Sequence, residues 1–375
     1  MPDRETIATA IRTARESQLL TQQQLAEKAG LGSLQIISDI ERAVREVKAW
    51  ELVRVARALH VPVDVLLGLQ PALSTRVFWR RGTAQQSREI ESRFLERARR
   101  FALLEAWCDL PPVEPLPEWP LDPKGASFPD AVRIAEQAGQ LLNLGSRPAA
   151  SLLAILEERF RIKIFYEELG PEGSAASVRG DFGPAILMNS SEAPWRRNYN
   201  FAHELFHLIT WSAVDAQLPR DGEEPDWLEK LEKLADAFAS RLLLPADAVE
   251  AEFIARVRGG RIGHLELVEV AREFDVSTAA LLWRLVNMGR LKRETAELLL
   301  QNENFKRVDR QSVSDRWLAP PGPISDRFKR LATLAYRKGR LSKARLAEFL
   351  EVTLSELTDI DLEDESVAEA TVPAA

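Results

Sequence analysis

Residues 201–209 read FAHELFHLI, and this stretch decides how the rest of the chain is interpreted. It places His203 and His207 four residues apart in an apolar run, and residues at that spacing share one face of a helix. Two imidazoles on one face can bind a single Zn²⁺ ion, while Glu204, offset around the helix, can accept a proton from water. The H-E-x-x-H pattern is typical of zinc metalloproteases. The alternative is a helix with two partly buried histidines and a surface glutamate.

The overall composition limits the class of protein. The chain has 375 residues, of which 45% are hydrophobic, so two or three domains with packed cores are expected. The single cysteine, Cys108, excludes a disulfide framework and Cys-rich zinc fingers and suits a reducing cytoplasm. A net charge of −7 does not favour nucleic-acid binding by bulk charge, although a local site could bind DNA. The sequence shows no signal peptide and no long apolar run, so we expect a cytoplasmic protein that does not enter a membrane.

Residues 1–72 are expected to form five short helices joined by tight turns. Thr21 and Gln24 match a capping box that starts one of these helices, and Gly30 ends it. A further helix is expected from Ser33, and the pair forms a helix-turn-helix. Isoleucines of the second helix are expected to point inward, while its outward face carries short polar side chains that suit a recognition helix in a major groove.

The stretches LTQQQLAEKAGL, ISDIERA and LVRVARALHVPVDVLL resemble the XRE family of helix-turn-helix domains. This resemblance implies binding to a DNA operator through residues 20–45, usually as a homodimer. The side chains expected to contact DNA are Gln22, Ser33, Gln35 and Ser38. Residues 1–70 contain nine basic and nine acidic side chains, so the attraction to phosphates is expected to be modest. The alternative is a five-helix bundle that binds protein.

Residues 73–130 are expected to connect two domains. Residues 73–101 are basic, and we interpret them as the solvated face of a connecting helix in preference to a second nucleic-acid surface. Residues 109–129 are rich in proline, which cannot extend helices or sheet ladders. They are expected to form an ordered arm that packs on a surface through Trp119.

Residues 131–290 are expected to form a small zincin-like metallopeptidase domain with a short sheet. The sequence predicts two helices and then two strands, over residues 129–142, 149–160, 162–166 and 185–189. The glycine-rich residues 170–184 are interpreted as turns between the strands. In such domains an edge of the sheet lies beside the metal and can hold the substrate backbone as an added strand.

A catalytic zinc site needs a third protein ligand and one position for water. Glu232 and Asp236 are four residues apart, so they share a face of a helix downstream of the histidines. Glu232 could bind the metal while Asp236 accepts a hydrogen bond from the far nitrogen of a ligating histidine. Glu229 lies nearly on the same face and stays an alternative ligand, as does His264. The order along the chain, H-E-x-x-H and then Glu232 and Asp236, resembles that of thermolysin-like gluzincins.

The stretches NFAHELFHLI and EKLADAFASRLLLP together resemble the ImmA/IrrE metallopeptidase family over residues 145–290. The resemblance implies zinc ligands at His203, His207 and Glu232. It also implies that Glu204 is the catalytic base and that Asp236 holds a ligating histidine.

Members of that family are zinc-dependent endopeptidases that cut helix-turn-helix repressors. A protein substrate of this kind, a repressor or an antitoxin, would link the chain to transcription in stress response, mobile elements or toxin–antitoxin systems. Phe206 stands where relatives often have Gly, and Asp236 where they often have Asn, but neither change removes a required group. Tyr199 and Arg197 are candidates for the donor that stabilises the oxyanion.

The sequence therefore predicts an α+β fold, mostly α, with a helical region at residues 291–360 and a disordered tail at 361–375. Residues 265–284 and 341–352 repeat the pattern of the first helix-turn-helix, and we expect structural or protein-contact roles for both. The alternative function is a DNA-binding regulator whose peptidase fold is inactive and senses a ligand or partner. The complete set of ligands, base and aspartate favours the peptidase.

Overall fold

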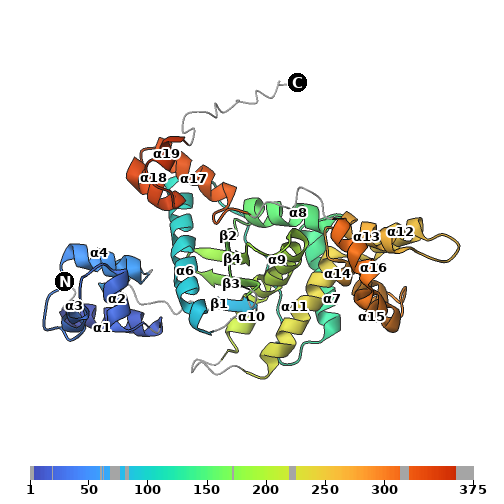
Figure 1. Cartoon of the computed structure of the whole chain (residues 1–375), viewed down its shortest axis with the longest axis horizontal. Coiled ribbons are helices and arrows are strands. Elements are labelled where there is room, and N and C mark those ends of the chain that lie inside the picture. The colour runs from blue at the N-terminus through green and yellow to red at the C-terminus, as the bar shows by residue number, and fades with distance from the viewer. Residues whose placement is uncertain are drawn as a thin grey trace.

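The computed structural model describes residues 4–18, 20–59, 61, 63–67, 77–80, 84–170, 173–218, 225–312 and 321–359. These residues form an α+β structure, mostly α, in which one small sheet is covered by helices (Figure 1). The tail expected at 361–375 lies outside the described ranges. Within those ranges, no helix is both long and apolar enough to cross a membrane.

The N-terminal unit is built of five helices around a core of its own (Figure 1). They are α1 (Arg4–Ser17), α2 (Gln22–Lys28), α3 (Leu34–Glu41), α4 (Ala49–Ala58) and α5 (Val63–Leu66). The predicted capping box is confirmed, because Thr21 and Gln24 each accept a hydrogen bond from the backbone of the other. Gly30 has φ +62°, a left-handed conformation that glycine adopts without steric cost, and it ends the helix as predicted. Ile37 and Ile40 are buried, so the predicted inward face of α3 is also confirmed.

A four-stranded sheet lies at the centre of the rest of the chain. Its strands are β1 (Val77–Arg80), β2 (Lys163–Glu167), β3 (Ala175–Gly180) and β4 (Gly183–Asn189). The order is β1-β3-β4-β2, with β2 parallel to β4 and the other pairs antiparallel. Strands β2 and β4 confirm the two predicted strands.

Strand β3 was not predicted, because residues 170–184 were interpreted as turns only. The small residues of β3 are compatible with a strand because β3 is central, hydrogen-bonded on both sides, and packed against α9 (Pro194–Ile209). Its alanines allow the helix to approach closely, whereas a strand signal read from the sequence depends on larger β-branched residues. Gly183, with φ +89°, starts the returning strand β4.

The basic residues 73–101 were interpreted as the solvated face of a connecting helix, and the structure agrees with this only in part. Their first described part is strand β1, and α6 (Ala84–Trp107) follows. This helix buries Phe94 and Phe101 against the sheet, because its apolar residues recur at helical spacing. Arg97 is only 8% exposed and pairs with carboxylates of β2 and of the C-terminal region. Arg93 and Arg100 of α6 likewise form ion pairs within the fold.

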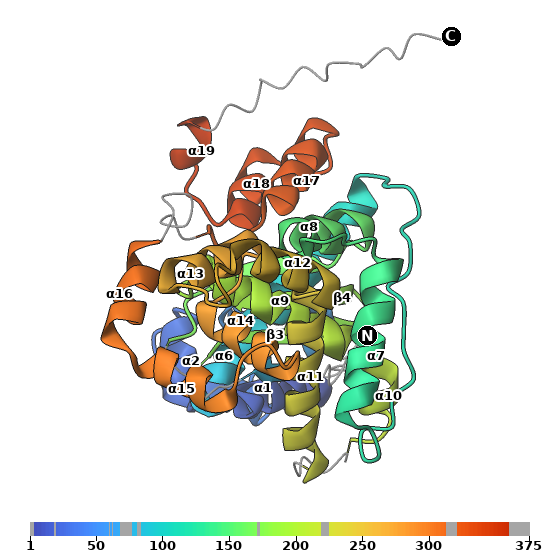
Figure 2. The ribbon, with the colours of Figure 1, turned by 90° about the vertical axis from the view of Figure 1, so that its right-hand side faces the viewer.

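Helices cover both faces of the sheet. Helix α9 packs on β3 and β4, and α11 (Trp227–Leu243) lies against α9. Helix α7 (Phe128–Leu141) runs beside α11, as Figure 2 shows, while α6 packs on β2 and β4. Successive side chains of a strand point to opposite faces of a sheet. Trp79 of β1 donates a hydrogen bond to Glu91 of α6, whereas its neighbours Phe78 and Arg80 contact α9. Helices α6 and α9 therefore lie on opposite faces.

Further helices complete this unit. They are α8 (Pro148–Ala154) with the π-helical turn η1 (Ile155–Arg159), α10 (Trp211–Asp215), α12 (Ala246–Arg256), α13 (His264–Glu273), α14 (Thr278–Asn287), α15 (Arg293–Gln301), α16 (Glu303–Gln311), α17 (Asp326–Arg337), α18 (Lys343–Leu350) and α19 (Glu356–Asp359). The predicted helices at 129–142 and 149–160 are confirmed by α7, α8 and η1. The predicted arm is confirmed too: Trp119 donates its backbone N–H to the carbonyl of Ile209 and its indole N–H to Gln137.

The two later repeats of the helix-turn-helix pattern are packed into the fold. Helix α14 buries three leucines, and Arg284 donates to the carbonyl oxygen of Leu244. Helix α18 buries Leu346, Phe349 and Leu350, and it packs against α17 at one end of the molecule (Figure 1). The buried leucines and Arg284 of α14 agree with the structural role expected for the first of these repeats.

Candidate metal centre

The motif helix α9 is buried along its C-terminal half. Residues 200–209 are all buried, because this half is apolar around most of its circumference and lies between the sheet and α11. His203, Glu204 and His207 are 1%, 0% and 3% exposed. The alternative of a surface glutamate is therefore wrong, and three polar side chains are enclosed where unpaired polar groups are costly.

Three side chains converge at one point beside α9. Nε2 of His203 and Nε2 of His207 are 3.2 Å apart, and each lies 3.2 Å from a carboxylate oxygen of Glu232 on α11. Ligands of a tetrahedral zinc ion with bonds of ~2.0–2.1 Å are separated from one another by about 3.3 Å. The three donors thus have the chemistry and the spacing of a two-histidine, one-carboxylate metal site, and among the described residues they form the one such group of three.

The two alternative third ligands lie elsewhere. Glu229 is 80% exposed at the side chain and pairs with Lys233 one turn along α11 at 2.6 Å. His264 begins α13 and packs its ring against Phe305 at a centroid distance of 5.4 Å. Neither side chain belongs to the converging group. Helical spacing alone could not separate Glu229 from Glu232, whereas the packing of α11 on α9 does.

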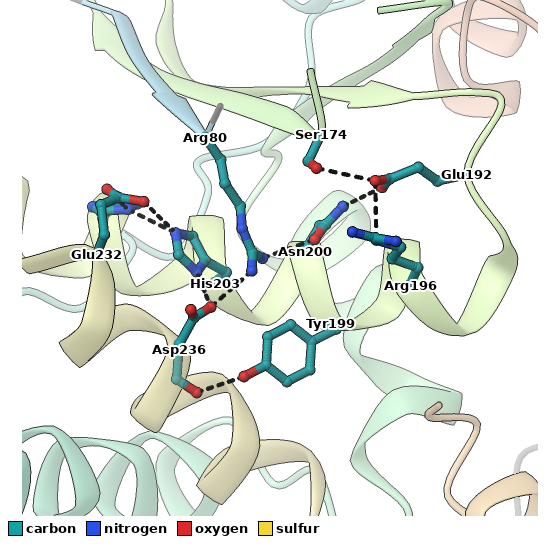
Figure 3. Close-up of polar contacts among 10 residues, drawn as sticks. Arg80, Ser174, Glu192, Arg196, Tyr199, Asn200, His203, Glu232 and Asp236 are labelled. Carbon is teal, nitrogen blue, oxygen red and sulfur yellow. Dashed lines mark hydrogen bonds and ion pairs between the residues drawn. The ribbon is translucent and has the colours of Figure 1, made fainter. Parts of the chain in front are cut away.

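Asp236 lies one turn beyond Glu232 on α11 and reaches the other side of the His203 ring (Figure 3). Its Oδ1 is 3.0 Å from Nδ1 of His203, so a protonated Nδ1 can donate to it. That hydrogen bond selects the tautomer in which Nε2, the atom facing Glu232, carries a free lone pair.

Glu204 has no hydrogen-bond partner for either carboxylate oxygen, although both oxygens are buried. A carboxylate enclosed in this way needs a polar partner to offset its desolvation. A metal site with a water molecule would supply one, so this orphaned group is a second observation that fits a metal centre. Nδ1 of His207 is also buried without a partner.

The second histidine is held by packing. The Phe78 ring from β1 stacks on the His207 ring with an interplanar angle of 4° and a centroid distance of 5.7 Å, and it meets Trp211 edge-on. Phe206 is fully buried and contacts Phe238 of α11 at a centroid distance of 5.4 Å. The Phe206 ring therefore fills the space between α9 and α11.

The charges at this site are coupled. Burial raises the pKa of Glu232, but the two imidazoles outweigh burial and hold the pKa of this carboxyl well below its usual range. Burial lowers the pKa of His203, while hydrogen bonds to Asp236 and Glu232 outweigh it and raise that pKa. A cation at this point would replace the proton that the cluster attracts, as expected for a site that exchanges protons for metal.

Arg80, at the end of β1, is a residue of this site that the sequence did not indicate. Its guanidinium donates to Oδ1 of Asp236 at 2.7 Å and to Oδ1 of Asn200 at 2.8 Å (Figure 3). The only available signal was the β-prone run of residues 77–79 before it, which the arginine-rich composition of the segment obscured.

The two candidates for the oxyanion donor are engaged elsewhere. Tyr199 donates its hydroxyl to the backbone carbonyl of Asp236 at 2.7 Å, so it joins α9 to α11. Arg197 donates to the backbone carbonyl of Ser190 at 3.2 Å and to that of Glu192. In this structure each side chain holds backbone together, and the donor that stabilises the oxyanion stays a prediction.

The residues expected to contact DNA differ in their exposure and in their hydrogen bonds. Gln35 is exposed on α3 and donates to Asp39 at 2.8 Å, while Ser38 is partly exposed. Ser33 is exposed before α3, and its hydroxyl makes no capping bond to that helix. Gln22 differs, because its amide donates to the buried carboxylate of Glu41 at 2.9 Å. If Gln22 contacts DNA, it does so with a side chain that also makes this hydrogen bond within the protein.

Two family models match parts of the chain. Residues 11–66 match a helix-turn-helix family, and residues 157–286 match Peptidase M78, described as the IrrE N-terminal-like domain. No curated protein matches the chain. The second match contains His203, His207, Glu232 and Asp236, and it begins after β1 and α6. The resemblance read from the sequence is therefore confirmed as a fusion of these two domains.

Proposed function

Because this chain joins a helix-turn-helix domain to an IrrE N-terminal-like domain, we propose that it is a zinc-dependent endopeptidase with its own DNA-binding domain. Its substrate would be a helix-turn-helix repressor or an antitoxin, cleaved in the cytoplasm to control transcription. The observation that supports this proposal most strongly is the triangle of His203, His207 and Glu232 beside the buried, unpaired Glu204.

Each residue of the site has a role in this proposal. His203, His207 and Glu232 would hold the zinc ion, and Asp236 would keep His203 in the tautomer that presents Nε2. Zinc bound by three protein ligands supplies Lewis acidity, which activates water and polarises a peptide carbonyl. Glu204 would take a proton from the attacking water onto a carboxylate oxygen and pass it to the nitrogen of the leaving amine. Burial of Glu204 favours this role because no internal donor competes for its oxygens.

The sheet offers a place for an extended peptide. Strand β1 is at the edge of the sheet, and among the described strands it pairs with β3 alone. Phe78 of this strand touches His207, so the edge runs beside the site. A substrate segment that adds to the free side of β1 would be bound through its backbone, which suits an endopeptidase that selects its site by context.

The N-terminal unit supports action near DNA. Its α3 presents Gln35 and Ser38 at the surface, as a recognition helix does in a major groove. We propose that this unit binds an operator through residues 20–45, as a homodimer, and so brings the peptidase to a repressor that occupies neighbouring DNA.

The proposal is tested with a small helix-turn-helix protein encoded beside the gene as substrate. The purified chain should convert it into two fragments whose masses add up to the substrate plus one water, as measured by intact-mass spectrometry. Treatment with a chelator should stop cleavage, and added Zn²⁺ should restore it. Zinc binding with no cleavage of any such protein would instead support the alternative, a regulator whose peptidase fold senses a ligand or partner.

A further inference from the structure

Arg80 joins three elements at the candidate metal centre. It is the last residue of β1, and its side chain is 15% exposed. One nitrogen of the guanidinium donates to Asp236 of α11 at 2.7 Å, and another donates to Asn200 of α9 at 2.8 Å. The group also lies over the Tyr199 ring, 5.4 Å from its centroid. A planar guanidinium suits this position because it can donate in two fixed directions at once.

Asp236 needs such a partner if it is to fix a histidine. Its side chain is 49% exposed, and a carboxylate in that setting has several rotamers and competing water molecules. The same oxygen, Oδ1, accepts from Arg80 and lies 3.0 Å from Nδ1 of His203 (Figure 3). The position of Arg80 therefore determines where the acceptor for His203 lies.

Arg80 is itself held from the opposite side. Asn200 is 1% exposed, and its amide oxygen accepts from Arg80 while its amide nitrogen donates to Glu192. Glu192 also accepts from the hydroxyl of Ser174 at 3.0 Å and pairs with Arg196 at 3.2 Å (Figure 3). This chain of contacts fixes which end of the Asn200 amide faces the guanidinium. It runs from Ser174, just before β3, through Glu192 and Asn200 to Arg80.

We propose that Arg80 is a positioning residue of the metal site, which holds Asp236 so that His203 presents Nε2 to the metal. The inference rests on the proposed function, because it requires that His203 binds a metal. It also assigns a role in the site to β1, a strand that precedes the residues matched by the IrrE N-terminal-like model.

A purely structural role for Arg80 makes a different prediction. In that case the arginine would join β1 to α9 and α11, and its loss would lower stability without a specific effect on the metal. A positioning role predicts a change in zinc affinity and in the electronic spectrum of a bound metal. It also predicts that the effect of Arg80 depends on Asp236, because residues that act through one another are not additive.

The test compares Arg80→Met with Arg179→Met in the full-length protein. Arg179 lies on the neighbouring strand β3 and pairs with Glu118, away from the metal centre, so its loss controls for removing a sheet arginine and an ion pair. Zinc affinity is measured by competition with a chelating dye, and the visible spectrum is recorded after Co²⁺ substitution. Thermal melting of the metal-free proteins reports any loss of the fold.

Arg80→Met should weaken zinc binding by about tenfold, the lower end of the effect of partners that hold a ligating histidine. It should also alter the Co²⁺ spectrum, while Arg179→Met leaves both unchanged. Arg80→Lys should recover part of the affinity, because an ammonium can keep the bond to Asp236 but cannot bridge to Asn200. In an Asp236→Ala background, Arg80→Met should have no further effect on zinc binding.

Unchanged zinc affinity and Co²⁺ spectrum in Arg80→Met would overturn the inference and leave the proposed function intact. The inference would also fail if the effects of Arg80→Met and Asp236→Ala were additive. If the parent protein bound no zinc, the proposed function would fail first and the inference with it. These outcomes are distinguishable because none of the readouts requires a substrate.

Discussion

Several residues of the metal site could be predicted from the sequence alone. His203, His207, Glu232 and Asp236 form two pairs with a spacing of four residues, and a helix brings each pair to one face. This regularity predicted the converging group that the structure contains. Asp236 offers an acceptor oxygen to Nδ1 of His203, so it makes the contact expected of it.

Arg80 could not be predicted in the same way. It lies 120 residues before Asn200 and 156 before Asp236, and no local period connects them. Only the pairing of β1 with β3 brings the guanidinium to the metal centre. The same limit applies to Tyr199 and Arg197, whose hydrogen bonds to backbone carbonyls depend on tertiary contacts.

Gln35 is predicted to contact DNA. Its side chain is exposed on α3, and an amide can bond to a base edge in the major groove. Gln35→Ala should weaken binding to an operator upstream of the gene by roughly tenfold or more, since a good base contact is worth ~1–3 kcal/mol. Gln140→Ala, which removes an exposed glutamine from α7, is the matched control. Equal affinity and sequence preference for the two variants in a binding titration would refute the contact.

Strand β1 is the element whose role changed most between sequence and structure. The segment interpreted as the solvated face of a helix contains an edge strand, whose Phe78 and Trp79 pack on opposite faces of the sheet, followed by a helix that buries one face. Alternation over four residues is too short a signal to outweigh the arginine-rich composition around it. Strand β3 was missed for the related reason that its small residues have little strand propensity.

Substitutions on the two faces of β1 are expected to differ in their effect on zinc binding. Phe78→Ala and Trp79→Ala should each lower the free energy of unfolding by roughly 3 kcal/mol, because each removes a packed aromatic ring. Only Phe78→Ala should also weaken zinc binding, by several-fold, since Phe78 stacks on His207 and Trp79 faces α6. Chemical denaturation and a zinc competition titration measure the two effects. Equal losses of zinc affinity would show that β1 acts on the site through stability alone.

The whole molecule has two separate hydrophobic cores. One belongs to α1–α5, and the other extends from β1 to the C-terminal helices. The contacts between these units include the ion pairs Lys28–Glu89 at 2.7 Å and Arg57–Glu348 at 3.6 Å. Surface pairs of this kind contribute little to stability. The sequence predicted the N-terminal unit because its turns and caps are local, but it did not show that residues beyond 291 share the core of the peptidase unit.

A substitution at Phe328 tests whether the two hydrophobic cores unfold independently. It packs against Phe101 and Phe165, with centroid distances of 5.1 Å and 6.3 Å, so α17 is tied to α6 and β2. Phe328→Ala should cost ~3–5 kcal/mol in the peptidase unit and leave unfolding of the N-terminal unit unchanged. Calorimetry should resolve two transitions, of which one moves. A single transition that shifts as a whole would contradict two independent cores.

The zinc content and the proteolytic activity of Glu204→Gln, measured on the same sample, test the central claim most directly. Glutamine keeps the shape of the side chain at the fully buried position 204 but cannot accept the proton from water. We predict about one zinc ion per chain in both the parent and the variant, and cleavage of the neighbouring helix-turn-helix protein by the parent only. His203→Ala should lose the metal and serves as the control. Cleavage by Glu204→Gln at the parental rate would contradict the account.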